Sequence, residues 1–141
     1  MNDKTLYDYA MSFIGRPYYW GGCTPMTGFD CSGFVLELLK ACGLIEPKKD
    51  LTAQNIWSSF MDKNQPSFGA LAFYGRDASN ITHVGFCLDD STIIEAGGGG
   101  VDTTTLQRAV ERQAFIRLRP IYYRKDFLLT TTPPYPWRKK G

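Results

Sequence analysis

The sequence is poor in histidine, in net charge and in long apolar runs. His83 is its single histidine, and its four cysteines form no Cys-x-x-Cys pair. Structural zinc sites need Cys and His ligands at short spacings, so we expect no metal site. A net charge of +2 is too small to indicate nucleic acid as a partner, although it is compatible with an anionic polymer. No apolar run approaches the roughly 20 residues of a membrane span, so no membrane insertion is expected.

The beginning of the chain lacks the pattern of a secretory signal peptide, because residues 1–4 lead directly into an amphipathic segment. We therefore expect synthesis in the cytoplasm without a signal peptide. A length of 141 residues with 43% apolar content suits one domain around one hydrophobic core.

Helical periodicity dominates the first half of the chain, and strand alternation dominates the second. The predicted helices span residues 3–14, 31–42 and 52–62, with a short one at 104–112. The predicted strands span residues 70–74, 81–88, 91–97 and 114–121. Helices followed by an antiparallel meander of strands form an α+β pattern.

The last residues lose this periodicity. Residues 133–136 carry three prolines, which forbid a helix, and residues 138–140 are basic. We expect residues 1–128 to form the domain and residues 129–141 to form an extended, proline-rich basic tail. An inert solvated terminus and a docking peptide both fit this tail.

Cys31 is predicted to be the first residue of the second helix. Asp30 is a good N-cap, and Gly43 is a good terminator after the last periodic residue. At such a position the partial positive charge of the helix N-terminus favours thiolate over thiol, which makes the sulfur nucleophilic. The alternative is that Cys31 is a small buried residue. Cys42 lies on the apolar stripe of the same helix and is predicted to belong to the core.

His83 lies on the strand predicted for residues 81–88. Strand alternation places His83, Gly85 and Cys87 on one face, opposite Val84 and its apolar neighbours. Histidine is the side chain suited to exchange a proton with a cysteine near pH 7. A lone strand histidine is more often structural, but its pairing with a helix-start cysteine favours a catalytic role.

Glu95 is the candidate for the third group, which would fix the orientation of the histidine. It follows His83 by twelve residues across the predicted hairpin. If the two are direct cross-strand neighbours, the hairpin loop must be odd in length, such as residues 88–90. A two-residue turn at 89–90 would place Glu95 on the opposite face.

Three motifs in order resemble the NlpC-type cysteine peptidases, which are papain-like bacterial cell-wall hydrolases. They are Gly-Arg-Pro-Tyr-Tyr-Trp-Gly-Gly at 15–22, Gly-Phe-Asp-Cys-Ser-Gly-Phe-Val at 28–35 and Thr-His-Val-Gly-Phe at 82–86. The resemblance covers residues 3 to 121. It implies a papain-like α+β fold in which N-terminal helices pack on an antiparallel sheet.

The same resemblance implies a thiol protease in which Cys31 is the nucleophile and His83 is the general base and acid. Glu95 falls at the family's third polar position, which more typically holds His, Asn or Gln. A glutamate there is expected to hold an imidazolium more tightly and to raise the pKa of the histidine. That would shift the pH optimum upward or indicate a different reaction.

Three further residues receive roles from the resemblance. Tyr18 is expected to help form the active-site wall or the oxyanion region. Asp30 and Ser32 are expected to help receive the amino end of a stem peptide. No organic cofactor and no metal are implied.

The function predicted from the resemblance is a peptidoglycan endopeptidase that cleaves cell-wall stem peptides after γ-D-glutamate. One alternative is a Cys-His amidase, deamidase or acyltransferase acting on another acyl substrate. A second is a structural or wall-binding module of a phage tail with a vestigial site. Residues 95–100 and 117–120 resemble bacteriophage or prophage members, which implies phage-tail proteins as partners and action on the cell wall as part of a phage particle.

Overall fold

The computed structural model describes residues 1–17, 23–24, 28–29, 31–97, 105–111 and 114–138. The helices are α1 (Asp3–Met11), α2 (Cys31–Ala41), α3 (Ala53–Phe60) and α4 (Leu106–Glu111), with a 3-10 helix η1 (Ile121–Tyr123). The strands are β1 (Cys23–Thr24), β2 (Gly28–Phe29), β3 (Leu71–Gly75), β4 (Ile81–Cys87), β5 (Thr92–Gly97), β6 (Phe115–Pro120) and β7 (Phe127–Thr131). The predicted helices and strands are therefore present, with small differences at their ends.

Local hydrogen bonds explain where the helices begin and end. The Asn2 side chain accepts from the backbone N–H of Thr5 at 2.9 Å and so caps α1. Thr52 caps α3 in the same way. Helix α2 ends before Gly43, whose φ of 77° is the left-handed conformation that stops a helix. None of the helices in the described parts of the chain has the length and apolarity to cross a membrane.

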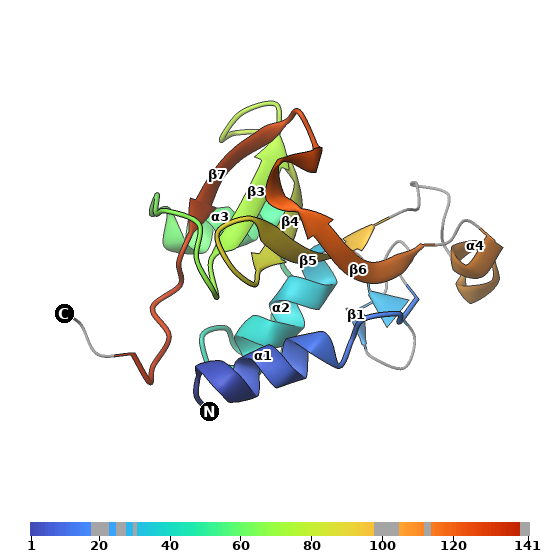
Figure 1. Cartoon of the computed structure of the whole chain (residues 1–141), viewed down its shortest axis with the longest axis horizontal. Helices are drawn as coiled ribbons and strands as arrows, with labels where there is room; N and C mark the ends of the chain where they lie inside the picture. Colours follow the sequence, from blue (N-terminus) through green and yellow to red (C-terminus); the bar gives the residue numbers. More distant parts are fainter. Residues whose placement is uncertain (18–22, 25–27, 30, 98–104, 112–113, 139–141) are drawn as a thin grey trace.

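The strands β3 to β7 form one antiparallel sheet in the order β6-β5-β4-β3-β7 (Figure 1). The run from β3 to β6 is a meander, which confirms the predicted α+β class. Strands β1 and β2 form a separate two-stranded ladder.

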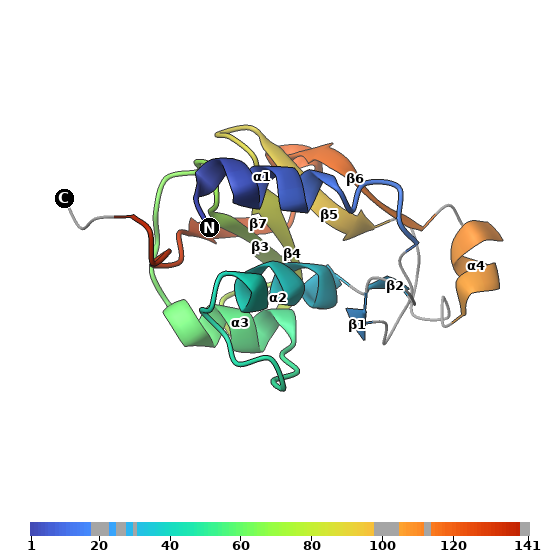
Figure 2. The ribbon, with the colours of Figure 1, turned by 90° about the horizontal axis from the view of Figure 1, so that it is seen from below.

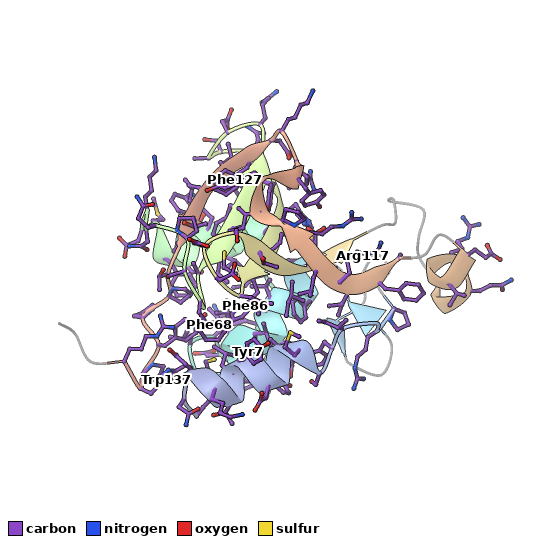
Figure 3. All side chains as sticks on the ribbon, in the orientation of Figure 1. Tyr7, Phe68, Phe86, Arg117, Phe127 and Trp137 are labelled. Atoms are coloured by element: carbon purple, nitrogen blue, oxygen red, sulfur yellow. The ribbon has the colours of Figure 1, made fainter. Side chains whose placement is uncertain are left out.

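Two helices cover one face of the five-stranded sheet. Helix α2 packs on β4 and β5, and α3 packs on β4 (Figure 2). The main core lies in this layer and includes Val84, Phe86 and Ile94 from the sheet. Phe68 packs between Tyr7 and Phe86, with ring centroids at 6.2 and 5.6 Å respectively (Figure 3). The hydrophobic core predicted from composition is thus built where helices meet strands.

The other face of the sheet is also buried. A second, smaller apolar cluster lies there, and it contains Ala70, Ala72, Tyr74, Cys87, Ile93 and Ile121. The alternation predicted for β4 therefore holds, but the face that carries His83 and Cys87 is not an open polar surface.

The segment predicted as an extended tail differs from expectation. Its first residues belong to β7, which pairs with β3 from Leu71↔Thr131 to Tyr74↔Phe127. Tyr135 is buried, and its hydroxyl donates to the backbone oxygen of Gly69 at 2.6 Å. The physical reason is that prolines begin only at residue 133, so the preceding residues keep the N–H groups that a strand needs.

Candidate active site

Helix α2 begins at Cys31, as predicted, and directs its first turn toward β4. The Cys31 thiol is partly buried and donates to the backbone oxygen of Thr82 at 3.8 Å. Thr82 immediately precedes His83, and the Cys31 side chain interacts with the His83 imidazole and favours its charged form. The contact of Cys31, at the start of α2, with the backbone of Thr82 therefore brings the predicted nucleophile close to the predicted base.

Two other cysteines among the described residues, Cys42 and Cys87, are buried more deeply than Cys31. Cys42 is buried in the main core, as predicted, and burial raises the pKa of its thiol to about 11. Burial likewise raises the pKa of Cys87 to about 12. Both are free cysteines, and both stay protonated near neutral pH. Neither is a candidate nucleophile.

His83 is buried between its partners, with 6% of its surface exposed. Its Nε2 contacts Oε2 of Glu95 in a short hydrogen bond. Because Nε2 is engaged, Nδ1 is the ring nitrogen that remains for Cys31. The Tyr74 ring packs beside the imidazole, with ring centroids 5.4 Å apart.

The surroundings of His83 favour its charged form. Burial by itself lowers the pKa of His83, but hydrogen bonding of the imidazolium to Cys31 and Glu95 and the negative charges of these groups outweigh it and raise the pKa to about 9. This agrees with the expectation that a glutamate at the third position raises the pKa of the histidine.

The β4–β5 hairpin brings Glu95 near His83, and the sequence predicts the odd length of its loop but not the position of the loop. The N–H of Leu88 donates to the oxygen of Thr92 at 2.8 Å, which leaves a three-residue loop, 89–91. The odd loop length is confirmed. The loop lies one residue later than the predicted 88–90, because the Asp89 carboxylate accepts from the N–H groups of Ser91 and Thr92 and holds both in the turn.

This shift changes how the two side chains meet. The ladder pairs Phe86 with Ile94 and Cys87 with Ile93, so Glu95 is not directly opposite His83. The two are therefore not the direct cross-strand neighbours that a loop at 88–90 would make of them. The two residues still share a face, because both lie at odd-numbered positions in a register that pairs odd with odd, and Glu95 reaches His83 diagonally.

Two partners of Glu95 were missed by the sequence reasoning. The Tyr123 hydroxyl donates to Oε1 of Glu95 at 2.5 Å, and Nε of Arg119 lies 3.8 Å from the same oxygen. Alternation on β6 could have placed Arg119 on this face, because Arg117 pairs directly with Glu95. Tyr123 lies in η1, outside any strand periodicity, and carries no comparable signal.

The remaining predicted site residues are only partly described. Ser32 lies in the first turn of α2, half-buried and next to Cys31. Tyr18 and Asp30 lie outside the described residues, so their roles stay predictions. Within the described ranges, no group of three or more His, Cys, Asp or Glu side chains is arranged to hold a metal ion.

Comparisons with known proteins agree on one family. The model of the NlpC/P60 family matches residues 15–119. The probable peptidoglycan endopeptidase LytE of Bacillus subtilis is 31% identical over 116 residues, which are 82% of this chain and 34% of LytE. The chain therefore spans about a third of the length of that relative.

Solved structures show the same fold. A protein of Staphylococcus aureus described as similar to lipoprotein, NLP/P60 family, superposes with a TM-score of 0.70 at 22% identity, over 94% of this chain and 42% of that one. RipD of Mycobacterium tuberculosis superposes with a TM-score of 0.67 at 17% identity, over 94% of this chain and 96% of RipD. RipD is described as a non-catalytic NlpC/p60 domain protein adapted to peptidoglycan binding. Because the family model matches well over half of the residues, the chain belongs to the NlpC/P60 family.

Proposed function

We propose that this chain is a peptidoglycan endopeptidase that cleaves cell-wall stem peptides after γ-D-glutamate. The observation that carries the proposal is a buried His83 that is hydrogen-bonded to the Glu95 carboxylate and interacts with the side chain of the helix-start Cys31, whose thiol contacts the adjacent Thr82. Membership of the NlpC/P60 family and the name of the relative LytE support the substrate class. The bond after γ-D-glutamate is the one that the resemblance in the three motifs implies.

In the acylation step, the Cys31 thiolate attacks the carbonyl carbon of the scissile amide. The backbone N–H of Cys31 at the helix start is the proposed oxyanion donor, and a donor of this kind contributes about a hundredfold to a thousandfold. His83, as imidazolium, gives its Nδ1 proton to the departing amine when the C–N bond breaks. A thioester on Cys31 and a neutral His83 result.

In the deacylation step, neutral His83 removes a proton from water as the water oxygen attacks the thioester carbonyl. The C–S bond then breaks, which releases the carboxylic acid product and restores Cys31. Glu95 keeps Nε2 of the ring engaged throughout, so Nδ1 faces the sulfur in both steps. Tyr18 as part of the oxyanion region, and Asp30 and Ser32 as acceptors of the substrate amine, belong to the same proposal.

Two alternatives have support of their own. Deamidation or acyl transfer would share the Cys31 thioester and differ only in the acceptor. The likeness to RipD supports a wall-binding module without catalysis. The contacts of Cys31 and His83 favour catalysis over the second alternative, because a binding module has no need of a buried histidine between a thiol and a carboxylate. The phage particle as carrier stays a prediction from residues 95–100 and 117–120.

Digestion of purified peptidoglycan, followed by mass analysis of the soluble fragments, tests the proposal. We expect new fragments that end in γ-D-glutamate from the wild-type chain and none from Cys31→Ala. Cys42→Ala is the matched control, because it removes a buried thiol of the core. We expect it to release the same fragments as the wild-type chain. An absence of new fragments with the folded wild-type chain would contradict the endopeptidase, and amide loss without backbone cleavage would favour the deamidase.

A further inference from the structure

A buried carboxylate has to be compensated by its surroundings, and Glu95 is only 1% exposed. His83 engages one of its oxygens, Oε2. The other oxygen, Oε1, accepts from the Tyr123 hydroxyl at 2.5 Å and faces Nε of Arg119 at 3.8 Å. Each carboxylate oxygen therefore has its own partner, and the one that does not face the histidine points to η1 and β6.

Tyr123 and Arg119 are themselves held together. The Arg119 guanidinium lies over the Tyr123 ring, with its central carbon 5.2 Å from the ring centroid. The Tyr123 ring also approaches Tyr74, with centroids 6.2 Å apart. Nε of Arg119 is buried and has no hydrogen-bond partner among the described residues, and the nearby charge of Glu95 compensates it.

The geometry points to Tyr123 as a positioning residue that, with Arg119, clamps the Glu95 carboxylate so that its second oxygen holds His83 toward Cys31. We name Tyr123 and Arg119 the Glu95 clamp. The inference rests on the proposed function of Cys31 and His83 and adds to it the group that fixes the third residue.

Two physical arguments support the clamp. A carboxylate held at one oxygen only can rotate about its last side-chain bond, whereas a donor on the other oxygen fixes its plane. Burial raises the pKa of Tyr123 above its usual range, and its hydrogen bond to Glu95 adds to this, so the phenol stays a donor throughout the neutral and moderately alkaline range. An outer partner of this type typically contributes about tenfold or more to the activity of the group it orients.

Alkylation of Cys31 by iodoacetamide at pH 7.5, located by peptide mass spectrometry, tests the clamp without any substrate. We expect Tyr123→Phe, which removes one oxygen and keeps the ring, to slow alkylation at Cys31 about tenfold. Tyr122→Phe is the matched control, because Tyr122 is 63% exposed against 39% for Tyr123, and we expect its rate to equal that of the wild type. Equal rates in Tyr123→Phe and the wild type would overturn the inference.

A double-variant comparison separates positioning from a general structural effect. In a Glu95→Ala background, Tyr123→Phe is expected to cause no additional slowing, because the carboxylate that it holds is gone. The proton on Nε2 of His83 gives a second readout by NMR, and we expect its resonance to broaden by solvent exchange in Tyr123→Phe but not in Tyr122→Phe. The inference would be overturned if Tyr123→Phe slowed alkylation of Cys31 as much in the Glu95→Ala background as in the wild type. It would also be overturned if the resonance of the Nε2 proton did not broaden in Tyr123→Phe.

Arg119→Met covers the case in which Tyr123→Phe folds poorly. It keeps the apolar stem and removes the charge, so slower alkylation at Cys31 supports the clamp and an unchanged rate contradicts it. All these readouts use the free protein. They can therefore support or overturn the Glu95 clamp whether or not the chain cleaves peptidoglycan.

Discussion

The two faces of the five-stranded sheet are both buried, but they are stabilised differently. Under α2 and α3, β4 and β5 contribute Val84, Phe86 and Ile94 to a core of many apolar contacts. On the opposite face, beside the smaller apolar cluster, the same strands contribute His83 and Glu95, which are held mainly by hydrogen bonds between named atoms.

This difference has consequences for mutation. An apolar core spreads its stabilisation over many weak contacts, so changes of shape cost stability in proportion to the atoms removed. A buried polar network depends on each donor and acceptor, because one missing partner leaves a buried group unsatisfied. We therefore expect substitutions in the apolar core to act on folding, and substitutions in the hydrogen-bonded network of His83 and Glu95 to act mainly on chemistry.

The largest effect is expected from His83→Gln. Glutamine retains a side-chain donor for Glu95 but cannot exchange a proton with Cys31, so turnover of a stem peptide should fall by about three to four orders of magnitude. Steady-state rates with a synthetic stem peptide, together with a circular dichroism spectrum, measure this. A variant with more than a tenth of the wild-type rate would show that His83 is not the base.

The next largest effect is expected from Phe86→Ala, three residues along the same strand but on the other face. Removal of a fully buried phenyl ring should lower the free energy of unfolding by about 3–5 kcal/mol. The fraction that remains folded should alkylate at Cys31 at the wild-type rate. Urea unfolding measures the loss of free energy, and alkylation without urea measures the reactivity of Cys31 in the folded protein. Slower alkylation of the folded variant would show that the two faces are not independent.

Glu95→Gln should reduce turnover about tenfold to a hundredfold and change how stability depends on pH. The raised pKa of His83, about 9 instead of 6.5, gives the wild type a stabilisation that is complete below pH 6.5 and lost as pH rises through 9. Loss of the Glu95 charge lowers the pKa of His83 and removes the part of this contribution that Glu95 supplies. Urea unfolding at pH 6 to 10 should show the wild type exceeding the variant most at pH 6, and a constant difference would contradict the raised pKa.

The smallest effect is expected from Tyr135→Phe, in the segment after β7. Loss of the hydroxyl leaves the backbone oxygen of Gly69 without this buried donor and should cost about 1–2 kcal/mol of unfolding free energy. Alkylation of Cys31 should stay unchanged, because Tyr135 packs in the main core. Thermal unfolding measures the loss, and a Tm equal to that of the wild type would indicate that the segment after β7 does not stabilise the domain.

Much of this molecule can be predicted from local pattern. The start of α2 at Cys31 and the face of His83 on β4 follow from helix caps and strand alternation, and the odd hairpin loop follows from the condition that Glu95 shares the face of His83. The diagonal approach of Glu95 could not be predicted, because the Asp89 carboxylate sets the turn and shifts the register.

The rest depends on contacts between distant parts of the chain. Tyr123 meets Glu95 across 28 residues, and Trp137 donates to Asp3 across 134. Such contacts leave no periodic signal in the sequence. Local pattern does not predict strand β7 for a different reason. The prolines that follow it dominate the composition of the last residues.

The titration of His83 tests the central claim most directly, because the chain has a single histidine and its NMR signal needs no assignment among others. Our account predicts a pKa of about 9 in the wild type, with lower values in both Cys31→Ala and Glu95→Gln, since each removes a group that favours the imidazolium. A wild-type midpoint at or below 6.5, or one that neither substitution changes, would show that Cys31, His83 and Glu95 do not act as one unit.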